Sequence, residues 1–224
     1  MRPRVILHNA ISADGRLDWF RADQGLFYEL AGRFEEELTL VGSDTLLQSP
    51  QGSAIARDPD EIPEITPPNP KDRRPILVVP DSRGRIKNWP LLRSLPYWRD
   101  VFALGTSTTP KKQIDRLRRQ SVPYFLAGRR KVDLGQALKS LQERFGSKTV
   151  RVDGGGALNG VLLRSGLVDE ISLLIHPQFV GGVSPKSVFR ASDLIAAEGV
   201  IDLKLTHNET LDGGLVWLRY DVVR

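Results

Sequence analysis

Short apolar runs of strand length alternate with helically spaced apolar stripes along most of this chain of 224 residues. Strands of this kind that alternate with helices are typical of a largely parallel sheet covered by helices. Stripes of Leu, Ala and Phe predict helices over 26–34 and 134–145, each preceded by an aspartate suited to an N-cap, Asp23 or Asp133. Further helices are expected over 110–119 and from the glycines at 154–156 to Arg164, and buried strands at 5–7, 38–41, 75–79, 101–104, 122–126, 150–152 and 168–175. A brief helix capped by Ser43 or Asp44 is expected up to Leu47. Residues 48–74, rich in Pro, Asp and Gly, lack apolar periodicity and predict a long functional or mobile loop.

The C-terminal part departs from this alternation. Two strand-like segments, 201–211 and 215–223, flank Asp212, Gly213 and Gly214, a sequence suited to the positive φ angles of a hairpin turn. We therefore expect a single α/β domain over residues 1–224. Its sheet should be mixed and mostly parallel, flanked by helices and closed by a C-terminal antiparallel hairpin.

Composition excludes several classes of site. The chain has no cysteine, so a disulfide framework, a thiolate nucleophile and a Cys-ligated zinc are impossible. Its three histidines lie far apart without metal-ligand spacing, and no metal is expected. The longest apolar runs are too short for a membrane span or a signal peptide, which predicts a soluble cytoplasmic protein without a membrane partner. The net charge of +5 comes from scattered basic residues, so we expect no nucleic-acid partner.

Glycine and polar residues gather where the predicted strands end, which is the edge at which open α/β sheets bind ligands. The most concentrated stretch is "VDGGGALN", with Gly154, Gly155 and Gly156 between a strand and a helix. Taken alone, the three glycines have two equally good explanations. They could form a tight turn or allow close packing, or they could let the backbone approach a phosphate at a helix N-terminus. Asp153 likewise fits an N-cap as well as a functional carboxylate. No Gly-x-Gly-x-x-Gly or P-loop motif is present.

Four segments in order resemble the reductases of riboflavin biosynthesis: "NAISADGRL", "LTLVGSDTLLQSP", "RPILVVPDSRGR" and "VDGGGALNGVLLRSGLVDEISLLIHPQFVGG". The resemblance covers nearly the whole chain and implies a dihydrofolate reductase-like fold. It further implies a homodimer that uses NADPH to reduce the ribosylamino group of 2,5-diamino-6-ribosylamino-pyrimidinone 5′-phosphate to ribitylamino. The zinc deaminase domain of the bifunctional family members is absent from this sequence.

The same resemblance assigns roles to individual residues. It places two carboxylates beside the substrate as candidate proton-handling catalytic groups, Asp14 and Asp153. It assigns cofactor binding to Thr45, Asp81 and Ser82, and to the backbone of Gly154, Gly155, Gly156 and Ala157. It assigns substrate binding to Ser12, Arg16 and Arg33. In the related dihydrofolate reductases a Gly–Gly bond at this turn is cis.

Several positions depart from the family pattern, and most of them lie on the substrate side. Arg16 stands where the family commonly has lysine, and arginine cannot donate a proton near neutral pH. Asp153 stands where glutamate is usual, and Ser49 where a cofactor-side carboxylate is usual; Arg57 is a possible substitute for a nearby basic residue. Two alternatives therefore stay open: a reductase of the same fold that acts on a dihydropterin or on another imine or carbonyl, and a nucleotide-binding module without catalysis.

Overall fold

The computed structural model describes residues 2–64, 69, 71–183 and 186–224. Packing divides the chain into two compact units. The first unit comprises Met1–Pro3 and Glu36–Val150, and the second comprises Arg4–Glu35 and Arg151–Arg224. Strand β6 (Thr149–Val152) contributes residues to both units. Each unit is described below by itself.

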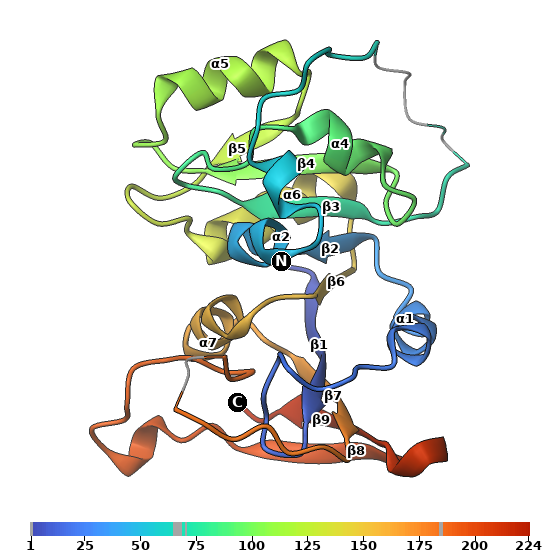
Figure 1. The fold of residues 1–224 in the computed structure, drawn as a ribbon. Helices are drawn as coiled ribbons and strands as arrows, with labels where there is room; N and C mark the ends of the chain where they lie inside the picture. The colour runs from blue at the N-terminus through green and yellow to red at the C-terminus, as the bar shows by residue number, and fades with distance from the viewer. Residues whose placement is uncertain (1, 65–68, 70, 184–185) are drawn as a thin grey trace. The chain divides into compact units, whose positions relative to one another are not determined.

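The first unit is a parallel sheet with helices (Figure 1). Its strands lie in the order β5 (Tyr124–Leu126), β4 (Asp100–Gly105), β3 (Ile76–Pro80) and β2 (Leu38–Leu40), and each neighbouring pair is parallel. Its core consists of apolar residues from the strands and from α4, with Trp89, Leu77 and Val79 fully buried. The helices are α2 (Ser43–Gln48), α3 (Gly52–Ile55), α4 (Trp89–Ser94), α5 (Lys111–Arg119) and α6 (Leu134–Phe145).

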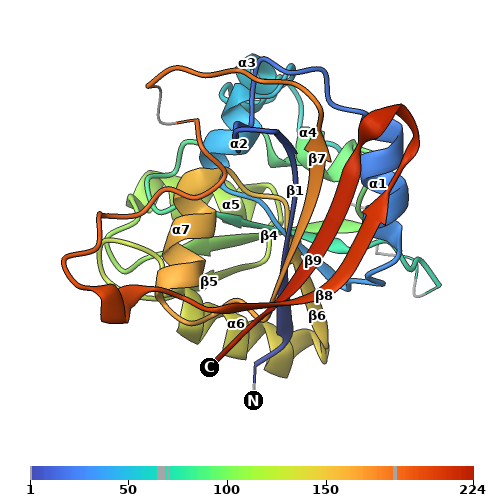
Figure 2. The same ribbon diagram turned by 90° about the horizontal axis from the view of Figure 1, so that it is seen from below.

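The second unit combines parallel and antiparallel pairing. Strand β1 (Arg4–Ser12) pairs in parallel with β7 (Glu170–His176). Strand β9 (Val216–Val222) is antiparallel to β7 and to β8 (Leu203–Thr210), so β8 and β9 form the C-terminal hairpin visible in Figure 2. The unit also contains α1 (Gln24–Gly32), α7 (Gly156–Arg164) and two short 3₁₀ turns, Ala197–Gly199 and Asp212–Gly214.

The predicted elements agree with the structure in type and order. The expected mixed, mostly parallel strand pairing with a terminal antiparallel hairpin is confirmed. Gly213 and Gly214 have φ angles of 71° and 76°, as the predicted turn requires. Asp23 and Asp133 cap their helices by accepting from the N–H groups of Leu26 and Gln136, both at 2.9 Å.

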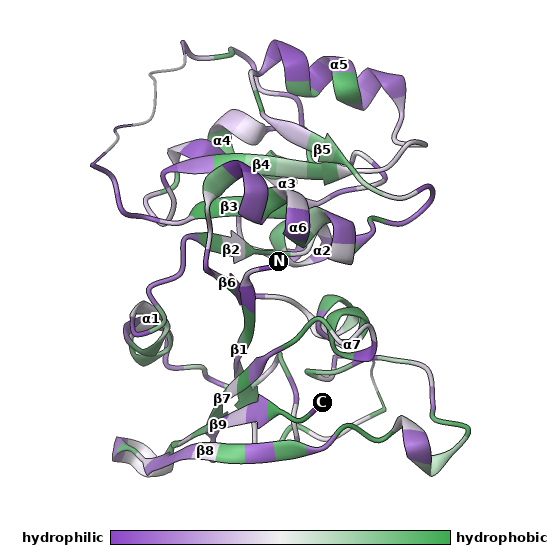
Figure 3. Cartoon of the chain, turned by 180° about the vertical axis from the view of Figure 1, so that it is seen from behind, coloured by the Kyte–Doolittle hydropathy of each residue, from purple (hydrophilic) through white to green (hydrophobic). Residues whose placement is uncertain are grey.

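Three local predictions need correction or completion. The helix after β2 has Gly42 as its N-cap, so the prediction that Ser43 or Asp44 caps it is wrong. The segment 48–74, expected to lack regular structure, contains the short helix α3, and its residues 65–68 and 70 lie outside the described part of the chain. Helix α4 was not predicted from the sequence. In Figure 3, β3 is largely apolar, whereas α5 is largely hydrophilic.

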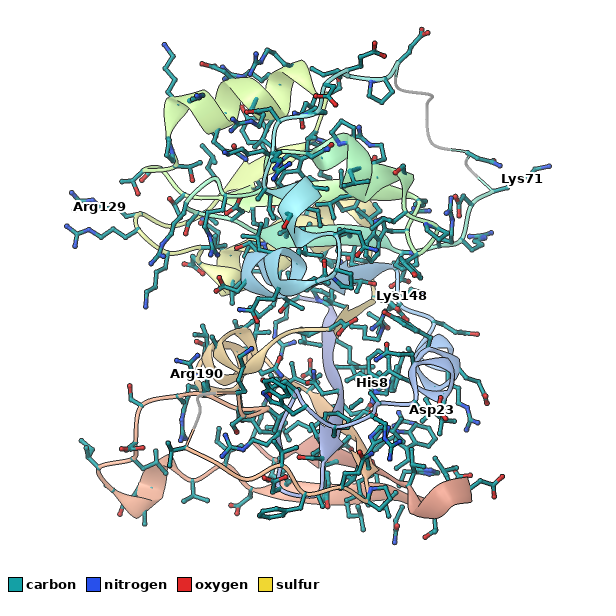
Figure 4. All side chains as sticks on the ribbon, viewed as in Figure 1. His8, Asp23, Lys71, Arg129, Lys148 and Arg190 are labelled. Carbon is teal, nitrogen blue, oxygen red and sulfur yellow. The ribbon has the colours of Figure 1, made fainter. Side chains whose placement is uncertain are left out.

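A buried histidine is built into the core of the second unit between β1 and α1 (Figure 4). His8 Nε2 lies 3.1 Å from the carbonyl oxygen of Phe27, which only accepts, so this nitrogen carries the proton. Nδ1 then accepts from the Ser172 hydroxyl at 2.9 Å, and Ser172 accepts from Trp217 Nε1 at 2.9 Å. The Phe27 ring stacks on the imidazole at 4.5 Å. The contacts therefore specify a neutral His8.

We expect acid to destabilise the fold through this residue. Burial is the main cause that lowers the pKa of His8 from 6.5 to about 4. Between these values the unfolded chain binds a proton that the folded chain does not, so the free energy of unfolding falls as pH falls from 6.5 to 4, by about 3 kcal/mol. Denaturant titrations across this range should show the fall in wild type and a shallower one in His8→Phe. The half-exposed His207→Gln serves as control for loss of a histidine outside the core. An unchanged slope in His8→Phe would contradict the assignment.

Candidate active site

The glycine stretch forms the turn between β6 and α7. Gly155 is the N-cap of α7 with extended backbone, φ −75° and ψ 166°, and no side chain caps the helix. The alternative that Asp153 is the N-cap is therefore wrong. The described residues contain no cis peptide bond, so the Gly–Gly bonds here are trans, unlike the related dihydrofolate reductases. The first N–H groups of a helix lack intrahelical acceptors and carry partial positive charge, which suits an anion.

Close packing within the second unit explains two of the three glycines. A Cβ on Gly154 would lie 2.9 Å from Asn159 Oδ1, and a Cβ on Gly156 would lie 2.0 Å from the backbone oxygen of Ser187. One turn further along α7, a Cβ on Gly160 would lie 1.9 Å from the backbone oxygen of Arg190, which Figure 4 places beside this helix. None of Gly154, Gly155 and Gly156 has a positive φ. The structure therefore explains Gly154 and Gly156 by contact with the chain's own atoms.

The loops after β1 and β7 meet because these strands are parallel neighbours. Ser12 lies opposite His176 in the register, and Ala13 N donates to Gln178 O at 2.8 Å just beyond. Asp14 then accepts three hydrogen bonds: from the Ser12 hydroxyl at 2.6 Å, from Val180 N at 3.1 Å and from Gly181 N at 2.7 Å. This arrangement brings two of the predicted substrate-side residues, Ser12 and Asp14, together.

These donors determine the charge of Asp14. The Ser12 hydroxyl, aided by the N–H groups of Val180 and Gly181, lowers the pKa of Asp14 to about 2. The carboxylate is therefore ionised at neutral pH and has no proton to give. Its contacts are those of an acceptor that holds the loop after β7 against the loop after β1.

Arg16 strengthens the same contact. Its guanidinium donates to the carbonyl oxygen of Gly182, and its Nε lies 3.7 Å from Asp14 Oδ2. The Arg16 backbone N–H also donates to Ser12 Oγ at 3.0 Å. Arg16 is thus placed with Ser12 and Asp14, as predicted, but its head group is bonded to protein.

A cavity of about 470 Å³ lies at the end of these two loops. Trp19 and Phe179 line it and are 86% and 81% exposed, although side chains of this kind are usually covered. Its remaining lining comes from Phe20, Gln178 and residues 180–183, which include the N–H groups that Asp14 holds. Neither Trp19 nor Phe179 was predicted from the sequence to be a site residue.

Asp153 directly follows β6 and lies beside an arginine. Its Oδ2 is 3.7 Å from Arg151 Nη1, and the Asp153 side chain is 31% exposed while that of Arg151 is 7% exposed. Part of the Asp153 side chain is therefore exposed while a buried cation lies beside it. The side chain of Asp14 is less exposed, at 16%.

Arg33, predicted to bind a substrate phosphate, follows α1 as its C-cap residue. Its guanidinium pairs with Glu29 at 3.5 Å and lies 5.2 Å from the centre of the Trp217 ring. Among the described residues, the contacts that join Ser12, Asp14 and Arg16 do not include it. Its phosphate-binding role stays a prediction.

The predicted cofactor residues of the first unit lie in the turns after β2 and β3. Asp81 accepts from Arg85 N at 3.0 Å and Ile86 N at 2.8 Å, so its side chain closes its own turn. Burial raises the pKa of Asp81. Ser82 O accepts from the Thr109 hydroxyl at 3.1 Å, and Thr45 lies in the first turn of α2. The cofactor roles of Thr45, Asp81 and Ser82 stay predictions.

Arg85 joins these two turns and was missed in the sequence. It donates to Asp44 Oδ1 at 2.5 Å and to Ser43 Oγ at 2.8 Å. In the second unit, Asn9 and Asn159, both buried, were also missed. A signal for Asn9 does exist, since an amide stands in a strand that is otherwise mostly apolar.

The described residues offer neither a metal cluster nor a membrane-spanning helix. They contain no group of three or more histidine, aspartate or glutamate side chains placed to hold a metal ion. No helix within residues 2–64, 69, 71–183 and 186–224 is long and apolar enough to cross a membrane.

Parallel strands with helices, an antiparallel C-terminal hairpin and a glycine turn that opens a helix after β6 define an α/β protein of the dihydrofolate reductase-like class. The chain belongs to the RibD C-terminal domain family, whose model matches residues 3–217.

Curated relatives agree with this assignment. The chain is 29% identical over 222 residues to the 2,5-diamino-6-ribosylamino-4(3H)-pyrimidinone 5′-phosphate reductase of Methanothermobacter thermautotrophicus, covering 96% of this chain and 97% of the relative. It is 30% identical over 195 residues to the protein of the same name from Archaeoglobus fulgidus, covering 81% and 84%.

Solved structures share the fold. A pyrimidine reductase-like protein from Corynebacterium diphtheriae superposes with a TM-score of 0.74 at 18% identity, covering 99% of this chain and 92% of that one. Acinetobacter baumannii RibD superposes with a TM-score of 0.70 at 19% identity. The chain spans 58% of the length of that RibD chain.

Proposed function

We propose that this protein is a nicotinamide-dependent reductase that uses NADPH to reduce the ribosylamino group of 2,5-diamino-6-ribosylamino-pyrimidinone 5′-phosphate to ribitylamino. The observation that carries the proposal is the family match over residues 3–217, together with relatives of that activity that align over nearly their whole length. The uncapped start of α7 supports a dinucleotide as cofactor.

The residues present fit such a cofactor. The nine-residue helix α7 begins without a side-chain cap, and Ala157 in its first turn is exposed. The backbone of Gly154, Gly155, Gly156 and Ala157 would hold the diphosphate, and the cofactor when bound supplies a hydride. Cofactor binding by Thr45, Asp81 and Ser82 of the first unit stays a separate prediction from the resemblance.

We assign different tasks to the two carboxylates. Reduction of the open-chain substrate adds a hydride to the imine carbon and a proton to the nitrogen. Asp153, partly exposed beside Arg151, is the group that holds or relays this proton, directly or through water. Asp14 holds Val180 and Gly181 in place on the substrate side, because its carboxylate already accepts three hydrogen bonds from protein groups.

One observation favours a second candidate. Arg16 replaces the family's lysine and donates to Gly182 O, so the substrate side lacks a lysine proton donor at this position. A reductase of the same fold that acts on a dihydropterin or on another imine or carbonyl would still need a proton, but its substrate need not receive that proton from this position.

A single assay separates these candidates. Purified protein is mixed with NADPH and the ribosylamino compound, and the loss of NADPH absorbance is followed, with NADH and dihydrofolate in parallel reactions. Turnover of the ribosylamino compound with NADPH is expected. Activity with dihydrofolate alone would select the second candidate, and tight NADPH binding without any turnover would select a non-catalytic binding module. The homodimer also stays a prediction, which the molar mass in solution by light scattering checks.

A further inference from the structure

Two buried asparagines tie the glycine turn to β1. Asn9 in β1 is 4% exposed, and its Nδ2 donates to the carbonyl oxygen of Gly154 at 3.0 Å. Asn159 in α7 is fully buried, and its Nδ2 donates both to Asn9 Oδ1 at 2.8 Å and to Val188 O at 3.0 Å. The two amides thus connect a strand, the turn, the helix and the segment that packs on the helix.

These bonds fix the direction of one peptide group. In a trans peptide the C=O and the following N–H point to opposite sides. With the Gly154 carbonyl held toward Asn9, the N–H of Gly155 is directed away from β1. Because the turn uses no positive φ, its orientation depends on these side chains rather than on a special backbone conformation.

Packing alone does not require this pair. A buried amide is costly unless its hydrogen bonds are made, and two apolar side chains of similar shape can replace a bonded pair at little cost in stability. The neighbouring polar residue of β1, His8, forms its hydrogen bonds with Phe27 and Ser172 inside the core. The Asn9–Asn159 pair instead forms a hydrogen bond with the turn at which the cofactor is expected.

We propose that Asn9 and Asn159 are positioning residues that orient the Gly154–Gly155 peptide and the start of α7 toward the diphosphate of a dinucleotide. This inference rests on the proposed function. It predicts that loss of the pair weakens cofactor binding even where stability is restored.

The test compares four proteins: wild type, Asn9→Leu, the double variant Asn9→Leu/Asn159→Leu, and Asn208→Leu as a matched control. Asn208 lies exposed on β8, away from the turn. Dissociation constants for NADPH come from fluorescence titration, kcat from saturating NADPH, and stability from thermal unfolding. Asn9→Ser, whose hydroxyl is too short to reach Gly154, replaces Asn9→Leu if that variant does not fold.

We expect about tenfold weaker NADPH binding in Asn9→Leu, which corresponds to about 1.4 kcal/mol, with kcat changed much less. The double variant should keep the weak binding at temperatures at which all four proteins are fully folded, a result that loss of stability alone would not produce. Binding in Asn9→Leu or Asn9→Ser within twofold of wild type, or binding that recovers together with stability in the double variant, would overturn the positioning role. If wild type itself fails to bind NADPH, the proposed function is the part that fails.

Discussion

Replacing Asp153 with asparagine is expected to lower kcat roughly 100-fold, within the range for loss of a positioned proton-transfer group. The amide keeps the shape of the side chain but cannot hold or relay a proton, and it leaves the neighbouring Arg151 in place. NADPH binding should change far less, because backbone groups after Asp153 are expected to hold the cofactor. Steady-state kinetics with the ribosylamino compound, and a cofactor titration on the same samples, check both statements.

Two further variants sharpen this experiment. Asp153→Glu restores the carboxylate usual in the family and should retain most of the activity. Asp202→Asn removes an exposed carboxylate of the second unit and should leave kcat unchanged. If the Asp153→Asn variant had the wild-type kcat, the proton would have to come from another group. The roles assigned to Asp153 and Asp14 would then be wrong.

Replacing Gly160 with alanine is expected to destabilise the protein by about 2 kcal/mol, the size of a typical overpacking effect. Helix propensity alone predicts the opposite sign, since alanine exceeds glycine by about 1 kcal/mol within a helix. The steric clash outweighs the gain in helix propensity, because the new Cβ would lie 1.9 Å from the backbone oxygen of Arg190 and 2.5 Å from its carbonyl carbon. Both are backbone atoms, so relief requires the segment around Arg190 to move away from α7. Urea denaturation measures the change.

Gly32→Ala provides the matched control for this variant. Gly32 is also helical, at the end of α1, but a Cβ there meets nothing within 4 Å. Alanine should therefore be neutral or stabilising by up to about 1 kcal/mol at this position. Equal effects of the two substitutions would show that the segment around Arg190 is not packed against Gly160 as described.

The elements of this fold were largely predictable because they are local. The stripe from Leu26 to Phe34, the cap at Asp23 and the turn at Gly213 each depend on residues close in sequence, and each was found in the structure. Helix α3 was missed because it is very short and lacks a periodic stripe. The cap of α2 was misplaced because the sequence offers Ser43 and Asp44, whereas the helix begins one residue earlier, after Gly42.

The candidate site was only partly predictable, because its contacts join residues far apart in sequence. The sequence places Asp14 beside a substrate by resemblance, but only the parallel register of β1 and β7 brings Val180 and Gly181 to its carboxylate. The resulting hydrogen bonds make it an acceptor rather than a proton donor. In the same way, the head group of Arg16 meets a carbonyl of the loop after β7.

The sequence by itself determined the alternating α/β pattern, the closing hairpin and the strand–glycine–helix order, since hydrophobic period and turn chemistry are short-range properties. Its motifs also carried the family resemblance that the comparisons support. Only the tertiary structure decided why glycine is needed at 156, because the close neighbour there is the backbone of Ser187, far along the chain. The close neighbour of Gly154, Asn159, is near in sequence, but its own position is held by hydrogen bonds to Asn9 and Val188. Long-range contacts therefore fix the surroundings of this turn, which no local pattern records.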